Sequence, residues 1–476
     1  MLAQYTSKAG RTDTYTVLSV FQKLGTEYVH LESRDKSFDF KVPKSAVKLI
    51  EQPKIPRTPT PTPPPTPTLL PITTRPGITL FEHQKIGVSK LMSAKRFLLN
   101  DDMGLGKTLQ AIVAADNTEC DHVIVICPAS LVKNWEREVG KFSLGERKFY
   151  VYSYGKIPNT ISSNAILILD ESHYCKNLKA QRTQKILKLC QTASKVWLLT
   201  GTVLTKNVMD AYVPLSILYS SQPSTSGYFA FGQRYSQVKA SRFGTKFEGV
   251  NEYNLPLLKE QLSKVVLTRK KHEVLDLPAK IRSVIPIKVS PALAEESAEL
   301  FERYSAGEGL AINLKSGKAF GTVRKELGVA KVKAGLDYIK EQFGESDESL
   351  VIFAYHRDVV QAIETALGKD CVSITGDTSI NKRQEYVDAF QSGKVKYIVL
   401  NIIAGGTGLT LTRATNSIFF EVDVTPASNL QAEDRIHRIG QTGTCNVHYL
   451  CAEDSLDDRM FAILNKKTED INRVMS

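Results

Sequence analysis

The chain has 476 residues, 42% of them hydrophobic and 24% charged, a composition typical of a soluble globular protein with two or three domains. No apolar run reaches the roughly 20 residues that cross a bilayer, and residues 1–30 lack the apolar core of a signal peptide, so a membrane protein is not expected. The formal net charge of +12 favours a polyanionic partner without identifying it.

Residues 1–52 are predicted to form a small β-rich accessory domain. The segments 14–21, 27–33 and 37–43 are rich in strand-forming residues, and the last of them alternates apolar and polar side chains. We expect a small barrel or meander that residues 45–50 close. About 50 residues barely support an independent core, so its stability should be marginal.

Residues 53–77 contain half of the chain's 20 prolines. Such a sequence cannot form a helix or a strand ladder, so we predict an extended proline-rich linker. A recognition site for a proline-binding module is the alternative interpretation.

From residue 78 onward, short apolar runs alternate with helical patterns, as a buried parallel sheet requires. We predict two doubly wound α/β lobes, 78–275 and 276–476, with a mostly helical stretch at about 205–345 between the two groups of strands. The expected strands are 97–100, 123–127, 149–153, 165–170 and 196–200 in the first group, and 350–355, 371–376, 397–401, 417–422 and 447–451 in the second.

The scattered cysteines, seven in number and never spaced C-x-x-C, predict reduced and mostly buried thiols. Neither a disulfide framework nor a zinc site is expected. We therefore expect an intracellular protein of the cytoplasm or nucleoid.

A phosphate-binding loop is predicted where the first strand ends, in DDMGLGKT. Its glycines let the backbone N–H groups face phosphate oxygens, its lysine places a cation on the outer phosphates, and its threonine hydroxyl can bind Mg²⁺. Asp101 stands where the first glycine of the usual motif would be. The expected ATP-binding residues here are Asp102, Met103, Gly104, Leu105, Gly106, Lys107 and Thr108.

Two adjacent carboxylates follow the predicted strand 165–170, in the sequence DESH. We expect Asp170 to hold Mg²⁺ through water and Glu171 to orient and deprotonate the water that attacks the γ-phosphate. A solvated turn is the alternative. Upstream, Leu80 and Gln84 are candidates to contact adenine, and a polar helix start is their alternative interpretation.

Several motifs in order resemble those of superfamily-two helicases, and specifically of Swi/Snf-type DNA translocases. They are DDMGLGKT, DESH, LLTGT (198–202) and QAEDRIHRIGQ (431–441). The segment CPASLVKNWEREVGKF (127–142) is similar to a DNA-contact segment of that group, and RKKHEVLDLPAK (269–280) is similar to its inter-lobe signature. Residues 231–262 and the stretch from IIAGGTG to HYL are similar to the annealing-helicase (HARP-type) branch. The resemblance covers about 78–476, and it implies two RecA-like lobes that clamp ATP.

The sequence departs from the family pattern at two points. DESH replaces the commoner DEAH, and LTGT is not followed by the usual proline, which leaves the local loop geometry open. No large insertion interrupts the lobes, so the chain is similar to a minimal motor of bacterial or phage type.

The resemblance implies that the second lobe completes the ATP site. Arg435 and Arg438 would be arginine fingers that stabilise charge on the transferring phosphoryl group, and Gln431 would help to position the γ-phosphate or the water. An ordinary surface salt bridge is the alternative role for the arginines.

The resemblance also implies residues for grip and coupling. His173 and the segment Thr200, Gly201 and Thr202 would couple hydrolysis to the grip on DNA. Small and polar residues would face the sugar-phosphate backbone, which carries no base code: Ser130, Lys133 and Asn134 from the first lobe and Gly405, Gly406 and Thr407 from the second. Arg269, Lys270 and Lys271 either add phosphate contacts or form a solvated charge run.

These features together predict a monomeric, DNA-stimulated ATPase that uses Mg²⁺, tracks along duplex DNA and remodels branched or partly unpaired DNA. Two alternatives remain: a conventional strand-separating helicase, and a non-enzymatic DNA-binding scaffold. The domain 1–52 either reaches a second DNA arm or serves protein docking or solubility.

Overall fold

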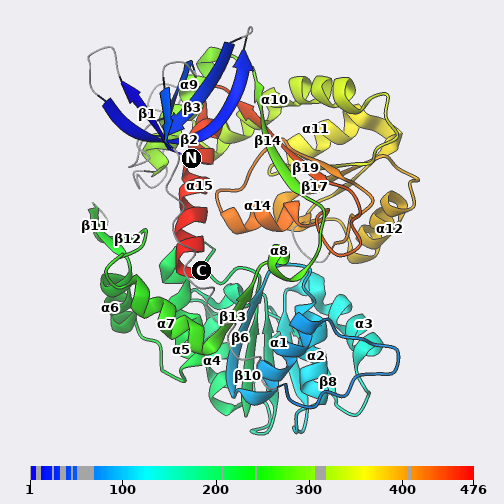
Figure 1. Cartoon of the computed structure of the whole chain (residues 1–476). Helices are drawn as coiled ribbons and strands as arrows, with labels where there is room; N and C mark the ends of the chain where they lie inside the picture. The colour runs from blue at the N-terminus through cyan, green and yellow to red at the C-terminus, as the bar shows by residue number, and fades with distance from the viewer. Residues whose placement is uncertain are drawn as a thin grey trace. The chain divides into compact units, whose positions relative to one another are not determined.

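A computed structural model of the chain describes residues 2–6, 12–23, 26–32, 39–43, 47–50, 69–205, 207–241, 244–305, 318–405 and 409–475. The chain divides into two compact units, Met1–Thr68 and Leu69–Ser476. Figure 1 shows the ribbon, and each unit is described by itself.

The first unit contains an antiparallel sheet in the order β4-β3-β2-β1-β5. Its strands are β1 (Leu2–Thr6), β2 (Thr12–Lys23), β3 (Thr26–Glu32), β4 (Asp39–Pro43) and β5 (Val47–Ile50). Strands β1 to β4 form a meander, and β5 returns to pair with β1, so the predicted β-rich accessory domain is confirmed. The sequence analysis missed β1.

Residues 69–77 are part of the second unit and are hydrogen-bonded within it, although they were predicted to belong to the linker 53–77. The backbone N–H of Leu70 donates to Ser89 Oγ at 3.0 Å, and that of Thr73 donates to Asn117 Oδ1 at 2.7 Å. These side chains satisfy the backbone of a segment that cannot form a ladder of its own. Residues 53–68 lie outside the described residues.

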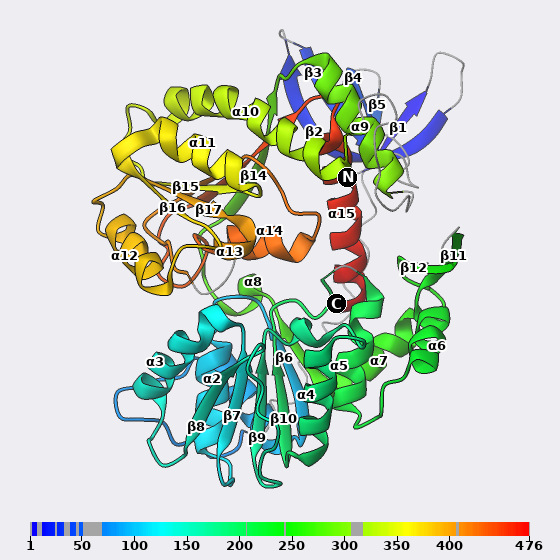
Figure 2. The same ribbon diagram turned by 180° about the vertical axis from the view of Figure 1, so that it is seen from behind.

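The first lobe is built on a parallel sheet in the order β13-β6-β10-β9-β7-β8. Its strands are β6 (Arg96–Asp101), β7 (Val123–Cys127), β8 (Phe149–Ser153), β9 (Ile166–Asp170), β10 (Lys195–Leu199) and β13 (Val266–Arg269). Helices α1 (Glu82–Ser93), α2 (Lys107–Asp116) and α3 (Val132–Phe142) cover one face, and α4 (Gln181–Thr192), α5 (Tyr212–Leu218) and α7 (Leu255–Val265) cover the other (Figure 2). Burial on both faces explains the near-continuous apolar runs.

The second lobe repeats this plan with the strand order β14-β19-β18-β15-β17-β16, again all parallel. Its strands are β14 (Lys280–Ile287), β15 (Leu350–Ala354), β16 (Cys371–Ile374), β17 (Tyr397–Asn401), β18 (Asn416–Phe419) and β19 (Cys445–Ala452). Helices α10 (Phe320–Phe343) and α11 (Arg357–Leu367) pack on one face, and α12 (Ile380–Gln391) and α14 (Pro426–Glu433) on the other. The prediction of two doubly wound α/β lobes is confirmed.

The stretch predicted as mostly helical, about 205–345, contains four strands that the sequence analysis missed. Two of them, β13 and β14, are edge strands of the two sheets. The other two form the hairpin β11 (Gln237–Ser241) and β12 (Gly244–Glu248), which follows α6 (Thr225–Tyr235). Edge strands mix polar with exposed apolar residues, such as the half-exposed Ile281 and Val284 on β14, so they lack the run that marks a central strand.

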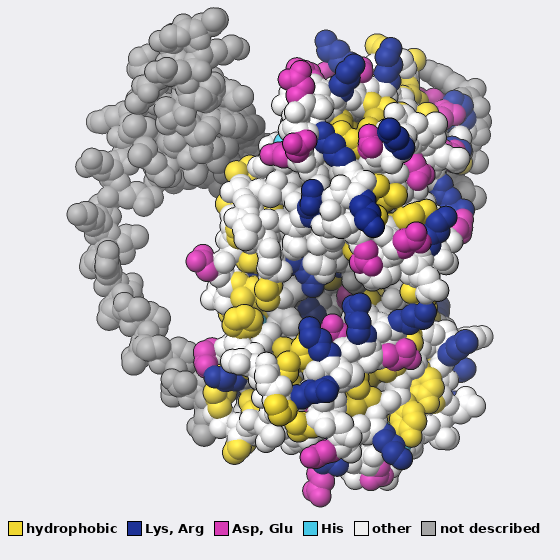
Figure 3. Space-filling view, turned by 90° about the vertical axis from the view of Figure 1, so that its right-hand side faces the viewer, with side chains coloured by type: hydrophobic (Ala, Val, Ile, Leu, Met, Phe, Trp, Pro, Cys, Tyr) yellow, Lys and Arg dark blue, Asp and Glu magenta, His cyan; other side chains and the backbone are white. Residues whose placement is uncertain are grey.

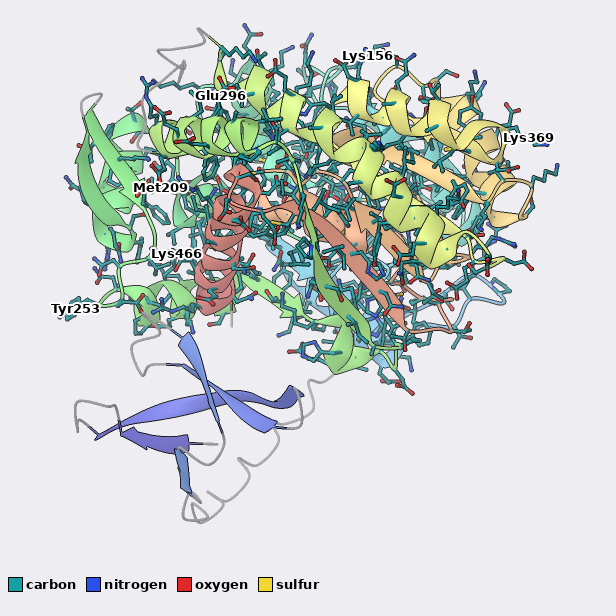
Figure 4. The ribbon with its side chains drawn as sticks, turned by 90° about the horizontal axis from the view of Figure 1, so that it is seen from above. Lys156, Met209, Tyr253, Glu296, Lys369 and Lys466 are labelled. Atoms are coloured by element: carbon teal, nitrogen blue, oxygen red, sulfur yellow. The ribbon has the colours of Figure 1, made fainter. Side chains whose placement is uncertain are left out.

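The last helix, α15 (Leu456–Met475), joins the cores of both lobes. Leu456, Met460 and Leu464 lie in the second lobe's core together with Phe301 of α9 (Pro291–Ser305). Near the other end, Val474 lies in the core of the first lobe. Figure 4 shows this helix, with Lys466 labelled on it.

All seven cysteines are buried and free, as predicted. In the described part of the chain, the helices are all too short or too polar to cross a membrane.

Candidate active site

The phosphate loop connects β6 to α2. Gly104 and Gly106 have φ angles of +88° and +78°, a region that glycine enters without strain. A Cβ at Gly106 would also lie 2.5 Å from Gln84 Nε2. The loop therefore needs both glycines, and it aims the N-terminus of α2 at the position where phosphate would bind.

Lys107 folds over this loop. Its Nζ donates to the carbonyl oxygens of Asp101 at 2.6 Å and Asp102 at 3.2 Å. Thr108 follows at the start of α2 and is half-buried. The predicted lysine and threonine thus stand side by side at one helix N-terminus, the arrangement that suits a Mg²⁺-bound phosphate chain.

Asp101, which replaces the first glycine of the usual motif, is fully buried and bound by Arg269. The guanidinium Nε donates to Asp101 Oδ1 at 2.8 Å, Nη2 donates to Oδ2 at 2.5 Å, and Gln110 Nε2 donates to Oδ2 at 3.1 Å. Bidentate pairs of this kind are strong and geometrically specific. The suggestion that Arg269 contacts nucleic-acid phosphate is therefore wrong, because its guanidinium is buried and already paired.

The start of α1 is fastened to the same loop. Gln84 is buried, its Oε1 accepts from the Phe81 N–H at 3.1 Å, and its Nε2 donates to the Leu105 carbonyl at 3.3 Å. His83 Nε2 lies 3.2 Å from that carbonyl oxygen, and Leu80 is buried beside them. Leu80 and Gln84 thus lie next to the phosphate loop, and their contact with adenine stays a prediction.

The two carboxylates lie at the end of β9. Asp170 Oδ2 accepts a hydrogen bond from Trp135 Nε1 at 2.8 Å, and Oδ1 accepts one from the Glu171 N–H at 3.0 Å. Burial raises the pKa of Asp170 to about 6, and the charge of Glu171 adds to this, while Trp135 and Lys107 oppose it. Such a carboxylate favours a divalent cation. Trp135 lies in the segment assigned to DNA contact, and its role beside Asp170 was not predicted.

Glu171 is buried and has a φ angle of +49°, a strained backbone that is typical of functional sites. Burial by itself would raise the pKa of Glu171. The hydrogen bond and charge of His173, together with the charges of Lys107 and Arg435, outweigh burial and hold this pKa below its usual value. Glu171 is therefore ionised at neutral pH, as a general base must be.

His173 joins the carboxylates to the segment 198–202. Its Nδ1 lies 3.3 Å from Glu171 Oε2 and 3.2 Å from Thr200 Oγ1. Thr200 Oγ1 also accepts from the Thr202 N–H at 3.0 Å. Gly201 packs against the phosphate loop, because a Cβ there would lie 3.0 Å from Met103 Cγ and 3.5 Å from Lys107 Nζ. The predicted coupling residues thus contact the ATP site directly.

Both predicted arginine fingers reach the phosphate loop from the second lobe. Arg435 is fully buried, and its Nη2 lies 3.8 Å from Met103 Sδ. Arg438 Cβ lies 3.3 Å from the position of a Cβ at Gly104. Each arginine donates to the Leu409 carbonyl oxygen at 3.1 Å.

Burial, with the neighbouring charge of Arg438, lowers the pKa of Arg435 to about 10, and Asp434 and Glu171 oppose this. Arg435 therefore remains charged at neutral pH. Gln431 is buried on α14, and its backbone carbonyl accepts from Arg435 Nε at 3.0 Å. The role of its side chain stays a prediction.

A cavity of about 610 Å³ lies at the carboxyl ends of both sheets and contains one of the predicted DNA contacts, Ser130. Residues of both lobes line it, and the sequence analysis missed most of them: Tyr154, Tyr174, Arg182, Arg357, Arg383 and Asn401. Figure 3 shows Lys and Arg side chains gathered around the hollow between the lobes. These residues stand singly in the sequence, so no local motif marked them.

Of the other predicted DNA contacts, Lys133 and Asn134 lie at the start of α3, a few residues after the cavity residue Ser130. Lys133 Nζ donates to Asn381 Oδ1 of α12 at 3.1 Å, and Asn134 Oδ1 accepts from Arg137. Gly405 ends α13 (Ile402–Gly405), whereas Gly406 and Thr407 lie outside the described residues.

Lys271 is buried and paired within the protein, so neither a contact with nucleic-acid phosphate nor a solvated charge run fits it. It is 6% exposed, and its Nζ donates to the His437 carbonyl at 2.6 Å and lies 3.0 Å from Asp434 Oδ1. Lys270 is more exposed, and its Nζ lies 3.5 Å from Asp102 Oδ1. The interpretation as a solvated charge therefore fits Lys270 and neither of the other two residues.

Two family models match the chain. The SNF2-related domain matches residues 83–161 and 155–318, and the helicase conserved C-terminal domain matches residues 331–440. These ranges contain the phosphate loop, both carboxylates and both arginines of the site described above.

Curated relatives match the chain over most of its length. It is 32% identical over 433 residues to "SWI/SNF-related matrix-associated actin-dependent regulator of chromatin subfamily A-like protein 1" of Xenopus tropicalis, covering 83% of this chain and 45% of that one. It is 30% identical over 435 residues to "DNA annealing helicase and endonuclease ZRANB3" of Homo sapiens, covering 82% of this chain and 40% of that one. The chain thus spans less than half the length of these two relatives.

Among solved structures, the "Sulfolobus solfataricus SWI2/SNF2 ATPase core in complex with dsDNA" aligns with a TM-score of 0.38 and 23% identity. The alignment covers 82% of this chain and 91% of that one.

Proposed function

The chain belongs to the SNF2-related family of helicase-type ATPases, and we propose on this premise that it is a DNA-stimulated ATPase that translocates on duplex DNA and remodels branched or partly unpaired DNA. The observation that carries the proposal is that the residues predicted for one hydrolysis site come together from both lobes. Lys107, Asp170 and Glu171 come from the first lobe, and Arg435 and Arg438 reach the same loop from the second.

The chemistry follows from these side chains. Backbone N–H groups of the loop and Lys107 bind the phosphates. Thr108 and Asp170 are the residues that would hold Mg²⁺, which offsets phosphate charge when it is bound, and the Trp135 indole keeps the Asp170 carboxylate oriented. Glu171 takes the proton of the attacking water, and the two guanidinium groups stabilise the charge that develops on the phosphoryl oxygens.

The lobe arrangement ties hydrolysis to DNA. The cavity that contains Ser130, Arg357 and Arg383 is lined by both lobes, so a change in their separation changes the grip on anything bound there. Tyr154 and Tyr174 stack with ring centroids 5.2 Å apart, and the Arg182 guanidinium lies 5.7 Å from the Tyr174 ring. The Tyr154 hydroxyl donates to the Asp170 carbonyl oxygen at 2.9 Å, so the arginines are the groups here that suit sequence-independent contacts to a sugar-phosphate backbone.

The relatives support the choice of branched DNA. One of them is named a DNA annealing helicase, and joining two strands requires a substrate that is partly unpaired.

The seven buried thiols fit an intracellular location, which we propose as well.

The test compares kcat without DNA and with linear duplex, single strands, forks and four-way junctions, with Glu171→Gln as the inactive control. Stimulation should be greatest with forked or four-way DNA, and binding should weaken steeply between about 50 and 200 mM salt, because phosphate contacts displace counterions. Annealing and strand-displacement assays follow on the best activator. Net separation of a plain duplex would indicate a conventional helicase, and an absence of stimulation by any DNA would refute the proposal.

A further inference from the structure

The connector between the two sheets, residues 269–282, is bound to the phosphate loop at its start. The Asp102 N–H donates to the Arg269 carbonyl at 3.0 Å, and the Lys271 N–H donates to Asp102 Oδ2 at 3.0 Å. Arg269 itself holds Asp101. The short helix α8 (Lys271–Val274) therefore begins at a fixed position against the loop that binds phosphate.

The same connector is bound to the arginine-bearing segment of the second lobe. Lys271 Nζ donates to the His437 carbonyl at 2.6 Å and pairs with Asp434 Oδ1 at 3.0 Å. Lys280 pairs with Asp434 Oδ1 at 3.1 Å, and Arg282 holds Glu433 through two hydrogen bonds of 2.7 Å. His437 Nε2 lies 2.9 Å from the Pro278 carbonyl oxygen.

Lys271 is the point where these two sets of contacts meet. Its backbone N–H binds the phosphate loop, and its ammonium binds the residues immediately before Arg435 and Arg438. Its side chain also passes the loop itself, because its Cε would lie 3.8 Å from a Cβ at Gly104. A buried ammonium cannot stay unpaired at low cost, so its ion pair with Asp434 fixes one geometry rather than several.

We propose that Lys271 is a positioning residue that sets the distance between the phosphate loop and the two arginine fingers in the closed ATPase. The inference rests on the proposed function and adds to it the residue through which lobe closure places the fingers. Misplacement of a catalytic group by about 1 Å can cost about a hundredfold in rate, so loss of this link should lower kcat.

Removal of the ammonium should leave the fold and the nucleotide pocket in place. Asp434 keeps its partner Lys280, the backbone link to Asp102 does not depend on the side chain, and Lys107 is untouched. Methionine matches the unbranched shape of the lysine stem. Lys271→Met should therefore separate turnover from nucleotide binding, which a purely structural defect would not do.

The experiment measures kcat, KM and ATP affinity of the full-length chain with saturating DNA. Lys271→Met should lose at least about tenfold in kcat and keep ATP affinity within about twofold of wild type. Lys271→Arg, which keeps a cation and donors, should recover part of the loss. Lys270→Met is the matched control, because Lys270 is the adjacent, more exposed lysine that lies beside Asp102, and its kcat should change by less than about twofold.

A second measurement keeps the inference testable apart from hydrolysis. In a double-mutant cycle of unfolding stability, Lys271→Met and Asp434→Asn should be non-additive, because they remove the same ion pair. Additive effects on stability would overturn the proposed link. So would an unchanged kcat in Lys271→Met, a loss of ATP affinity parallel to the loss of kcat, or an equal loss of kcat in Lys270→Met. If the wild-type chain had no ATPase activity but the two substitutions were non-additive in stability, the proposed ATPase function would be refuted. The link between Lys271 and Asp434 would still be supported.

Discussion

The two lobes share one sheet plan but contribute to the site in different ways. In the first lobe, the reactive groups follow directly from strands β6 and β9 and the start of α2, and each lies within a short motif. In the second lobe, Arg435 and Arg438 follow α14, and their position depends on contacts with residues far away in the sequence, such as Lys271 and Lys280. On the proposed function, the first lobe would carry the chemistry, and the second lobe would control when the site is complete.

Loss of a first-lobe group should have the largest effect. Lys107→Ala and Glu171→Gln should each lower kcat by more than tenfold, because these side chains act on phosphate and water and not on a core. Glu171→Gln should still bind ATP. Steady-state ATPase assays with saturating DNA measure this. More than about a tenth of wild-type turnover in either variant, with normal folding, would contradict the assignment.

Loss of an arginine side chain from the second lobe should lower kcat and leave ATP affinity nearly unchanged. Arg438→Ala should lower DNA-stimulated kcat by about one to two orders of magnitude and leave ATP affinity close to that of wild type, because a finger acts mainly in the transition state. Kinetics and nucleotide titration measure the two effects separately. Arg435→Lys is the better variant at the neighbouring position, since Arg435 is fully buried and truncation there would leave a cavity. An unchanged kcat in both variants would show that the second lobe does not complete the site.

A smaller effect concerns the stability of the first lobe in the absence of ATP. The pKa of Asp170 is raised to about 6, so the folded chain binds this proton more tightly than the unfolded chain does. Stability from this carboxyl is therefore lost as pH rises from about 4 to above 6. Asp170→Asn should abolish hydrolysis and stabilise the chain at pH 7 by about 1 to 3 kcal/mol.

Denaturant unfolding at pH 7 and pH 4 checks this expectation. Most of the difference between Asp170→Asn and wild type should be lost at pH 4, where the carboxyl is protonated in the folded chain and partly protonated in the unfolded chain. A difference of the same size at both pH values would show that the gain does not come from the titration of this carboxyl.

The same contrast between lobes explains how much the sequence could predict. The phosphate loop, the two carboxylates and ten of the twelve strands in the two parallel sheets carry local patterns, so they were predicted and the structure contains them. The pairs Arg269–Asp101 and Lys271–His437 join residues 168 and 166 positions apart, and no local pattern marks such a pair. The run of basic residues 269–271 therefore suggested contacts with solvent or with nucleic-acid phosphate. In the folded chain, Arg269 and Lys271 are buried and bind residues of the candidate site.

Trp135 illustrates a further limit. In the sequence it is an apolar residue on an amphipathic helix, which predicts only core packing. Its indole is buried, yet the N–H reaches Asp170. A buried tryptophan usually finds a partner for this N–H, but the identity of that partner depends on how α3 packs against β9.

The smallest expected effect concerns the first unit, because the residues assigned to hydrolysis all lie in the second unit. Its residues 1–50 carry eight Lys and Arg against five Asp and Glu, a net charge of +3. A tethered basic module near a bound motor has a high local concentration, so even a weak affinity for DNA adds to binding at a junction.

Because residues 69–77 pack onto the first lobe, a truncated chain should begin at Leu69 and retain those contacts. This chain should keep its duplex-stimulated kcat and lose a few-fold preference for forks or four-way junctions over linear duplex, measured as the ratio of half-saturating DNA concentrations. An unchanged ratio would assign the first unit to protein docking or solubility, and a fall in duplex-stimulated kcat would mean that the motor depends on it.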